Sequence, residues 1–185
     1  NGFGDLVVLV NPAFEALRYA SLFEMTQESC RGYFTSQVPR LAVLTSEADN
    51  ATKYAFPAGR VFTTLTESHV TLTRHDCQGR GRNGKVVTRI DEAKADRTTI
   101  GHFEPYLTHR LNPGAPAAAD RSLLQIQQDW AEHDNDKPVA FNGSQLKSLD
   151  RTTPLNPYLN IQVHKALISN HNDIWAMAFV PFYQI

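Results

Sequence analysis

The chain is poor in cysteine and carries almost no net charge. Its 185 residues include two cysteines, Cys30 and Cys77, whose separation matches no metal-binding pattern. Two free thiols are therefore expected, whereas a disulfide between them would indicate an oxidising compartment. Because 18 basic and 19 acidic residues give a formal net charge of −1, the composition indicates no nucleic-acid partner.

Long apolar runs and internal repeats are also missing. No stretch approaches the roughly 18 apolar residues of a membrane-spanning helix, so no transmembrane segment is expected. The hydrophobic content of 42% and charged content of 20% indicate one soluble globular domain. The sequence does not begin with Met and enters an apolar strand almost at once, so we expect it to start inside a domain. Any targeting signal would then lie upstream, which leaves the localisation unknown.

Three apolar, β-branched runs predict the core strands: Leu6–Val10, Leu41–Thr45 and Ile161–Ile168. The first two are continuous rather than alternating, which is typical of parallel strands that are buried on both faces. Between them, Pro12 suits a first helical turn, and Phe14, Leu17 and Ala20 recur at helical spacing. This order of strand, helix and strand predicts an α/β fold.

Residues 50–159 form a long insertion before the last predicted strand. Within it, 69–73 and 85–90 flank a segment rich in Gly and Arg, which predicts a hairpin with a solvated basic tip. A helix is expected over Arg121–His133, with Asp120 as its N-cap. The predicted core is then 1–49 together with 160–185, and the insertion is a cap region.

Two side chains that could carry chemistry each follow a predicted core strand. Asp49 comes shortly after the second strand, and His171 shortly after the third. Because functional groups in open α/β sheets lie beyond the carboxyl ends of the strands, the two are expected to meet. A carboxylate that binds one imidazole nitrogen fixes the tautomer and stabilises the imidazolium. Taken singly, Asp49 also suits a turn or helix cap, and His171 a packed loop residue.

Other residues offer alternatives to this pair. Glu47 is the fallback acid and His102 the fallback base. His102, Glu104 and His109 are close enough in sequence to suggest a metal, but their spacing matches no familiar site, so no metal is expected. Asn50 and Asn142 begin glycosylation-type triplets, and a glycan on Asn50 would argue against catalysis beside it.

The core segments resemble the C-terminal half of serine α/β hydrolases of the esterase and lipase type. Three segments carry the resemblance: Gly4–Ala16, Pro39–Asp49 and Asn160–Trp175. It implies that the three predicted strands are the last three parallel strands of the hydrolase sheet, with flanking helices. The family order of serine, acid and histidine implies that Asp49 is the acid and His171 the base.

The Gly-x-Ser-x-Gly turn that holds the nucleophile in this family is absent from the sequence. The resemblance therefore implies a partial hydrolase domain whose serine and missing N-terminal half come from an upstream segment. The expected substrate is a small ester or lipid-like molecule, and no cofactor is implied. Aromatic residues of the insertion are expected to shape its pocket: Phe56, Phe62, Phe103, Tyr106 and Trp130. The alternative is a non-catalytic scaffold or binding subunit with the hydrolase fold.

Overall fold

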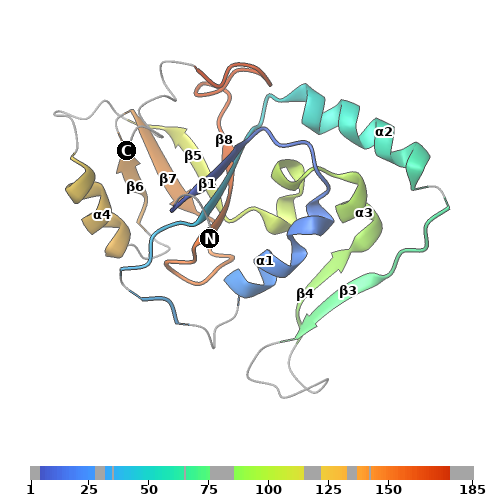
Figure 1. Ribbon diagram of the computed structural model, residues 1–185, viewed down its shortest axis with the longest axis horizontal. Helices are drawn as coiled ribbons and strands as arrows, with labels where there is room; N and C mark the ends of the chain where they lie inside the picture. Colours follow the sequence, from blue (N-terminus) through green and yellow to red (C-terminus); the bar gives the residue numbers. More distant parts are fainter. Residues whose placement is uncertain are drawn as a thin grey trace.

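The computed structural model describes residues 5–27, 32–34, 36–64, 66–75, 86–114, 122–132, 137–141 and 143–175. Its centre is a six-stranded sheet in the order β1-β2-β8-β5-β7-β6 (Figure 1). The bounds are β1 Val7–Val10, β2 Leu41–Ser46, β5 His109–Pro113, β6 Val139–Phe141, β7 Ser144–Ser148 and β8 Tyr158–Val163. From β1 to β5 all neighbours are parallel, whereas β7 pairs antiparallel with both β5 and β6. The fold is thus mixed α/β with a mostly parallel sheet.

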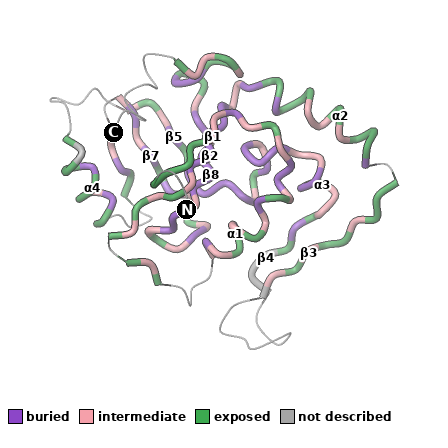
Figure 2. Tube along the Cα trace, in the orientation of Figure 1, coloured by how far each residue is buried: buried purple, intermediate pink, exposed green. Residues whose placement is uncertain are grey.

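The helices are short, and two separate cores cover the two faces of the sheet. The bounds are η1 Ala16–Tyr19, α1 Ala20–Thr26, η2 Ala51–Ala55, α2 Phe56–Thr63, α3 Glu92–Arg97, η4 Ile100–His102, η5 Glu104–Tyr106 and α4 Leu123–Ala131. Side chains alternate along β2, so Val43 packs with η1, α1, α3 and η4, whereas Leu44 faces α4. Figure 2 shows the buried residues concentrated along the central strands. In the described part of the chain, no helix has the length and apolarity of a membrane span.

The parallel pairing of the predicted core strands is present, but their limits differ from expectation. β1 pairs with β2, and β2 with β8, in parallel register. The third strand ends at Val163 rather than Ile168, because the carbonyl of His164 accepts from the amides of Leu167 and Ile168 and so closes a turn. Leu167 and Ile168 are buried all the same, which explains why the apolar pattern continues past the strand.

The segment 50–159 does not lie outside the sheet as the expected insertion would. It supplies β5, β6 and β7, so half of the six strands of this sheet come from it, and the predicted boundary at residue 160 is wrong. β5 joins the sheet because it pairs with β8 in parallel, starting from His109 opposite Ile161. The sequence reasoning missed these strands because β6 is short and β7, Ser144–Ser148, contains mostly polar residues.

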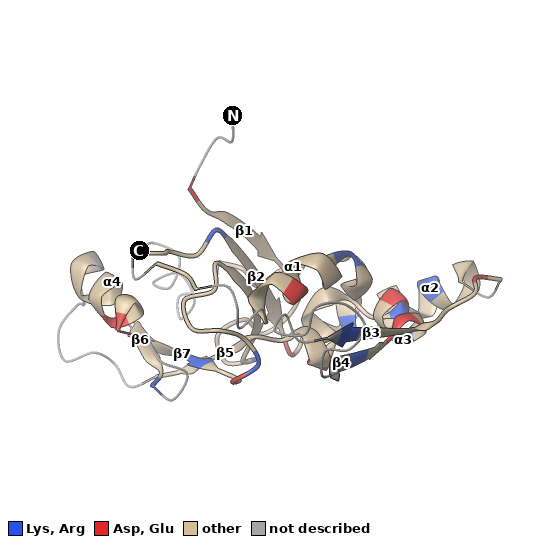
Figure 3. Cartoon of the chain, turned by 90° about the horizontal axis from the view of Figure 1, so that it is seen from below, with Lys and Arg blue, Asp and Glu red and all other residues tan. Residues whose placement is uncertain are grey.

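Local expectations had mixed outcomes. The predicted hairpin is present as β3 Thr71–His75 paired antiparallel with β4 Val86–Asp91, and its tip lies outside the described residues. Figure 3 shows acidic and basic residues interspersed over this hairpin, α2 and α3.

The helix after β1 starts later than Pro12 suggests, because Glu15 instead forms a bridge with Thr99. Ser122 caps α4 through a capping box, whereas the expected cap, Asp120, lies outside the described residues, as do Cys30, Cys77 and Asn142.

Candidate active site

Asp49 and His171 are in contact at the carboxyl ends of β2 and β8. Nδ1 of His171 lies 2.8 Å from Oδ2 of Asp49. The side chain of Asp49 is fully buried, whereas that of His171 is 42% exposed. An ionised carboxylate only accepts, so Nδ1 carries the proton and the neutral imidazole keeps the lone pair of Nε2. The expected contact between these two residues is therefore present. Nδ1 binds the carboxylate of Asp49, and Nε2 is the ring nitrogen that does not bind it.

The two oxygens of Asp49 have different partners, so the side chain caps the turn that follows it and also contacts His171. Oδ1 accepts from the amides of Ala51 (3.0 Å) and Thr52 (3.3 Å), as a residue that caps a helix would. Oδ2 accepts from the Thr52 hydroxyl at 2.6 Å in addition to His171. A carboxylate has about four lone-pair positions, so these four bonds satisfy it without water.

Opposing effects act on the pKa of Asp49. Burial alone raises this pKa, because it penalises the charged form. The hydrogen bonds from the Thr52 hydroxyl, His171 and the Thr52 amide outweigh that effect, so the pKa lies below its ordinary value. Asp49 is therefore ionised at neutral pH and can hold the ring of His171 in one orientation.

His171 reaches Asp49 although it lies eight residues beyond the end of β8, because the intervening turn is tied to the neighbouring strands. The Ser46 hydroxyl donates to the carbonyl of Ile168 at 2.5 Å. Asn11, just past β1, accepts from the Ser46 amide and donates to the carbonyl of His171, both at 2.9 Å. The ends of β1, β2 and the turn after β8 are thus joined into one support for the imidazole.

Asn11 and Thr52 are components of the site that the sequence reasoning missed. Asn11 has a φ of 47°, the left-handed region that Asn tolerates better than most residues. Thr52 lies three residues after Asp49, the spacing at which a hydroxyl can reach back to a capping carboxylate. Two features of the sequence could have identified these residues: an Asn directly after a predicted strand, and a Thr three residues after Asp49.

His102 adjoins the site and contacts the Thr52 side chain. Its Nε2 lies 3.1 Å from the Thr52 hydroxyl, which has one proton and donates it to Asp49. Nε2 of His102 must therefore be the donor in that contact. Burial lowers the pKa of His102, which keeps the ring neutral. His102 therefore supports Thr52, and it also interacts with the backbone and the charge of Asp49, which oppose the effect of burial on its pKa.

The remaining candidates point elsewhere. Glu47 accepts from the amide of Lys165 at 3.1 Å and faces His164, so the structure does not bring the fallback acid to His171. Glu104 forms ion pairs with Arg110 and Arg151, whereas His109 contacts Thr108. The trio considered for a metal therefore does not converge.

The aromatic residues expected to shape a substrate pocket do not gather at the Asp49–His171 pair. Phe103 and Tyr106 are buried in the core on the α1 and α3 side, and the Phe62 side chain is 78% exposed. Trp130 belongs to the opposite core, where it lines an apolar hollow of about 330 Å³ against the sheet face, near the residues that precede β1 and β2. The expectation of a single aromatic pocket is wrong because these residues come from both faces of the sheet.

Comparison with family models, with curated proteins and with solved structures finds no match for this chain. The geometry of the Asp49–His171 site is therefore the basis for inferring a function.

Proposed function

We propose that Asp49 and His171 are the acid and base of a serine hydrolase that acts on carboxylic esters or related acyl substrates. Nε2 of His171 would take the proton of the attacking serine and return it to the leaving group. Asp49 would orient the ring and stabilise the imidazolium. No metal ion or organic cofactor is needed for this chemistry.

The observation that carries the proposal is the 2.8 Å contact between a fully buried carboxylate and a half-exposed imidazole. A buried acid that is held by four hydrogen bonds keeps a fixed position, and the partly exposed ring can meet a substrate. The pair also lies beyond the carboxyl ends of parallel strands, where open α/β sheets place their functional groups.

The serine would come from a segment outside these 185 residues, because the sequence has no Gly-x-Ser-x-Gly turn. The exposed edge of the sheet supports a further partner of this kind. β1 is the edge strand, and Leu6, Val7 and Val8 are 49%, 56% and 41% exposed. An apolar strand whose outer edge has no partner strand among the described residues favours pairing with additional strands.

A non-catalytic scaffold with the same fold is the second candidate, and the absence of a recognisable nucleophile in the sequence favours it. A scaffold would keep the Asp49–His171 contact for stability alone. The two candidates differ in one measurable property, which is whether the imidazole is needed for turnover.

The test is hydrolysis of a short-chain chromogenic ester by the protein that includes the upstream segment. We expect His171→Ala to lower kcat by several orders of magnitude, and Asp49→Asn by about 10⁴-fold, because the amide favours the wrong tautomer. His164→Ala is the matched control, since this histidine also follows β8 but faces Glu47. His102→Ala should act more weakly, through the position of Thr52.

Near-normal turnover by the folded His171→Ala variant would refute the assignment. No turnover by the wild type across esters of several acyl lengths would favour the scaffold.

A further inference from the structure

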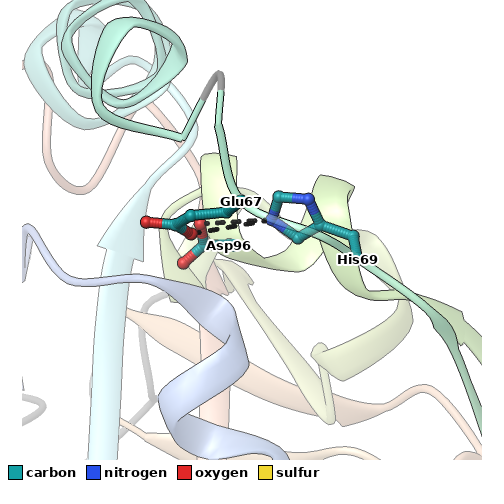
Figure 4. Close-up of side chains that lie close together, drawn as sticks. All are labelled: Glu67, His69 and Asp96. Atoms are coloured by element: carbon teal, nitrogen blue, oxygen red, sulfur yellow. Dashed lines mark ion pairs between the residues drawn. The ribbon is translucent and has the colours of Figure 1, made fainter.

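A second cluster of titratable side chains lies away from the Asp49–His171 pair. Glu67 and His69 come from the connection between α2 and β3, and Asp96 comes from α3 (Figure 4). Each offers one atom, and the three atoms all lie within 4.8 Å of one another. Nε2 of His69 is 3.8 Å from Oε2 of Glu67 and 3.7 Å from Oδ2 of Asp96. Figure 4 shows both carboxylates directed toward this one nitrogen.

Two of these atoms are buried without a hydrogen bond. Nε2 of His69 and Oδ2 of Asp96 have no hydrogen-bond partner in the described part of the chain. The side chain of Asp96 is only 10% exposed, and its other oxygen, Oδ1, already accepts from Arg60 at 2.7 Å. Burying a polar atom without a partner costs about 1–3 kcal/mol, and more for a charged group. A bound cation would satisfy both atoms together.

We propose that Glu67, His69 and Asp96 bind a divalent cation with the ligand preferences of zinc. One imidazole nitrogen and two carboxylate oxygens are a donor set that zinc accepts, with water in a fourth position. Zn–N and Zn–O bonds of about 2.0–2.2 Å place neighbouring tetrahedral donors roughly 3.3–3.5 Å apart. The two separations from Nε2 of His69, 3.8 and 3.7 Å, are slightly larger. The side chain of Glu67 is 51% exposed, so it can move inward to close the site.

The local charge also suits a divalent cation. The two carboxylates with a neutral imidazole carry a charge of −2. Arg60 pairs with Asp96, and Arg18 lies near enough to interact with its charge. Both arginines also pair with the carboxylate of Glu15, which offsets part of their positive charge. Exposed Glu67 leaves a path from solvent, while His69 and Asp96 provide the buried side of the site.

The bound ion would have a structural role. It would connect the segment before β3 to α3, two elements that are also joined by two hydrogen bonds between Val70 and Glu92 and by the bond from Arg97 to the Thr64 hydroxyl at the end of α2. Sequence spacing gave no sign of the site, because Asp96 is distant from His69 in the chain. The competing arrangement is a protonated His69 between two carboxylates, which would bind no metal.

Titration of the purified, chelator-treated protein with zinc chloride, followed by calorimetry, tests the proposal. We expect one zinc ion per chain and a rise in Tm. Glu67→Gln and His69→Gln should each weaken binding by at least about tenfold, as loss of even an outer-shell partner does at metal sites. Glu67→Gln alters an exposed side chain, so its effect cannot be attributed to unfolding.

His164→Gln is the matched control, because Nε2 of His164 lies 3.7 Å from a Glu47 oxygen and no third ligand joins them among the residues that the structure describes. It should bind zinc as the wild type does. The proposal is overturned if the wild type binds no zinc, or if Glu67→Gln and His69→Gln bind it with wild-type affinity. Neither result depends on ester hydrolysis, so it is independent of the proposed function.

Discussion

Thr52 donates its hydroxyl proton to Oδ2 of Asp49 over 2.6 Å, and this oxygen also accepts from His171. Both Thr52 and Asp49 are fully buried. The hydroxyl accepts from His102 in turn, so one small side chain connects the two histidines to the same carboxylate. This arrangement gives the acid a fixed position that its contact with His171 alone could not maintain.

Replacing Thr52 by Val should destabilise the protein by roughly 1.5–3 kcal/mol, because a hydrogen bond to a buried charged group is lost. Thr52→Ser keeps the hydroxyl and should cost less. Urea unfolding of both variants gives the comparison. Equal stability of the Val and Ser variants would show that the hydroxyl contributes nothing to holding Asp49.

The pKa of Asp49 predicts a specific acid sensitivity. This pKa lies below its ordinary value in the folded protein, so on acidification the unfolded chain takes up the proton first. The stabilisation that the ionised Asp49 side chain provides is complete above about pH 3.9, the ordinary pKa of this group in the unfolded chain. It is lost as pH falls through the lower pKa that Asp49 has in the folded protein. Urea unfolding between about pH 2 and 5 should therefore show a shallower pH dependence in Asp49→Asn than in the wild type. Parallel curves for the two proteins would contradict this.

Asn11 is expected to contribute both through its side chain and through its backbone conformation. Asn11→Gly keeps the φ of 47° but removes the bonds to Ser46 and His171, leaving the buried Ser46 amide unpaired. We expect a loss of about 1–3 kcal/mol in unfolding free energy. Asn11→Ala should lose about 1–2 kcal/mol more, because Ala disfavours positive φ. If Ala and Gly are equally tolerated, the backbone conformation is not what requires Asn here.

Gly101 has no room for a side chain. An added Cβ would lie 1.9 Å from Oγ1 and 2.1 Å from Cβ of Thr45, which is fully buried in β2. Gly101→Ala should therefore destabilise strongly, by about 1–3 kcal/mol or more, as overpacking does. It should also displace His102, the next residue.

Gly59→Ala is the matched control for Gly101→Ala. It lies in α2 with nothing within 4 Å of the added Cβ, so Ala should stabilise the helix by about 0.5–1 kcal/mol. Thermal unfolding of both variants provides the measurement. Opposite signs are expected, and two shifts of the same sign would show that space is not the deciding factor.

The sequence was sufficient for those features that depend on local pattern. Continuous apolar runs predicted β1 and β2. The burial on both faces that such runs indicate is present in β2, whereas Val7 and Val8 of β1 are exposed at the edge of the sheet. The β3–β4 hairpin followed from two short runs around a Gly-rich segment. The contact between Asp49 and His171 was predictable because parallel neighbouring strands bring their carboxyl ends to one edge.

The tertiary structure decided the features that depend on pairing between distant segments. β5 and β7 are strands because neighbouring backbones accept their hydrogen bonds, which no local pattern of polar residues reveals. Leu167 and Ile168 are buried although they lie in the turn after β8, so hydrophobicity could not locate where the strand ends. The sequence determined which residues could carry chemistry. Only the folded backbone placed Asn11 and Thr52 around Asp49 and His171. It also placed His69 between Glu67 and Asp96, because these residues come from different segments of the fold.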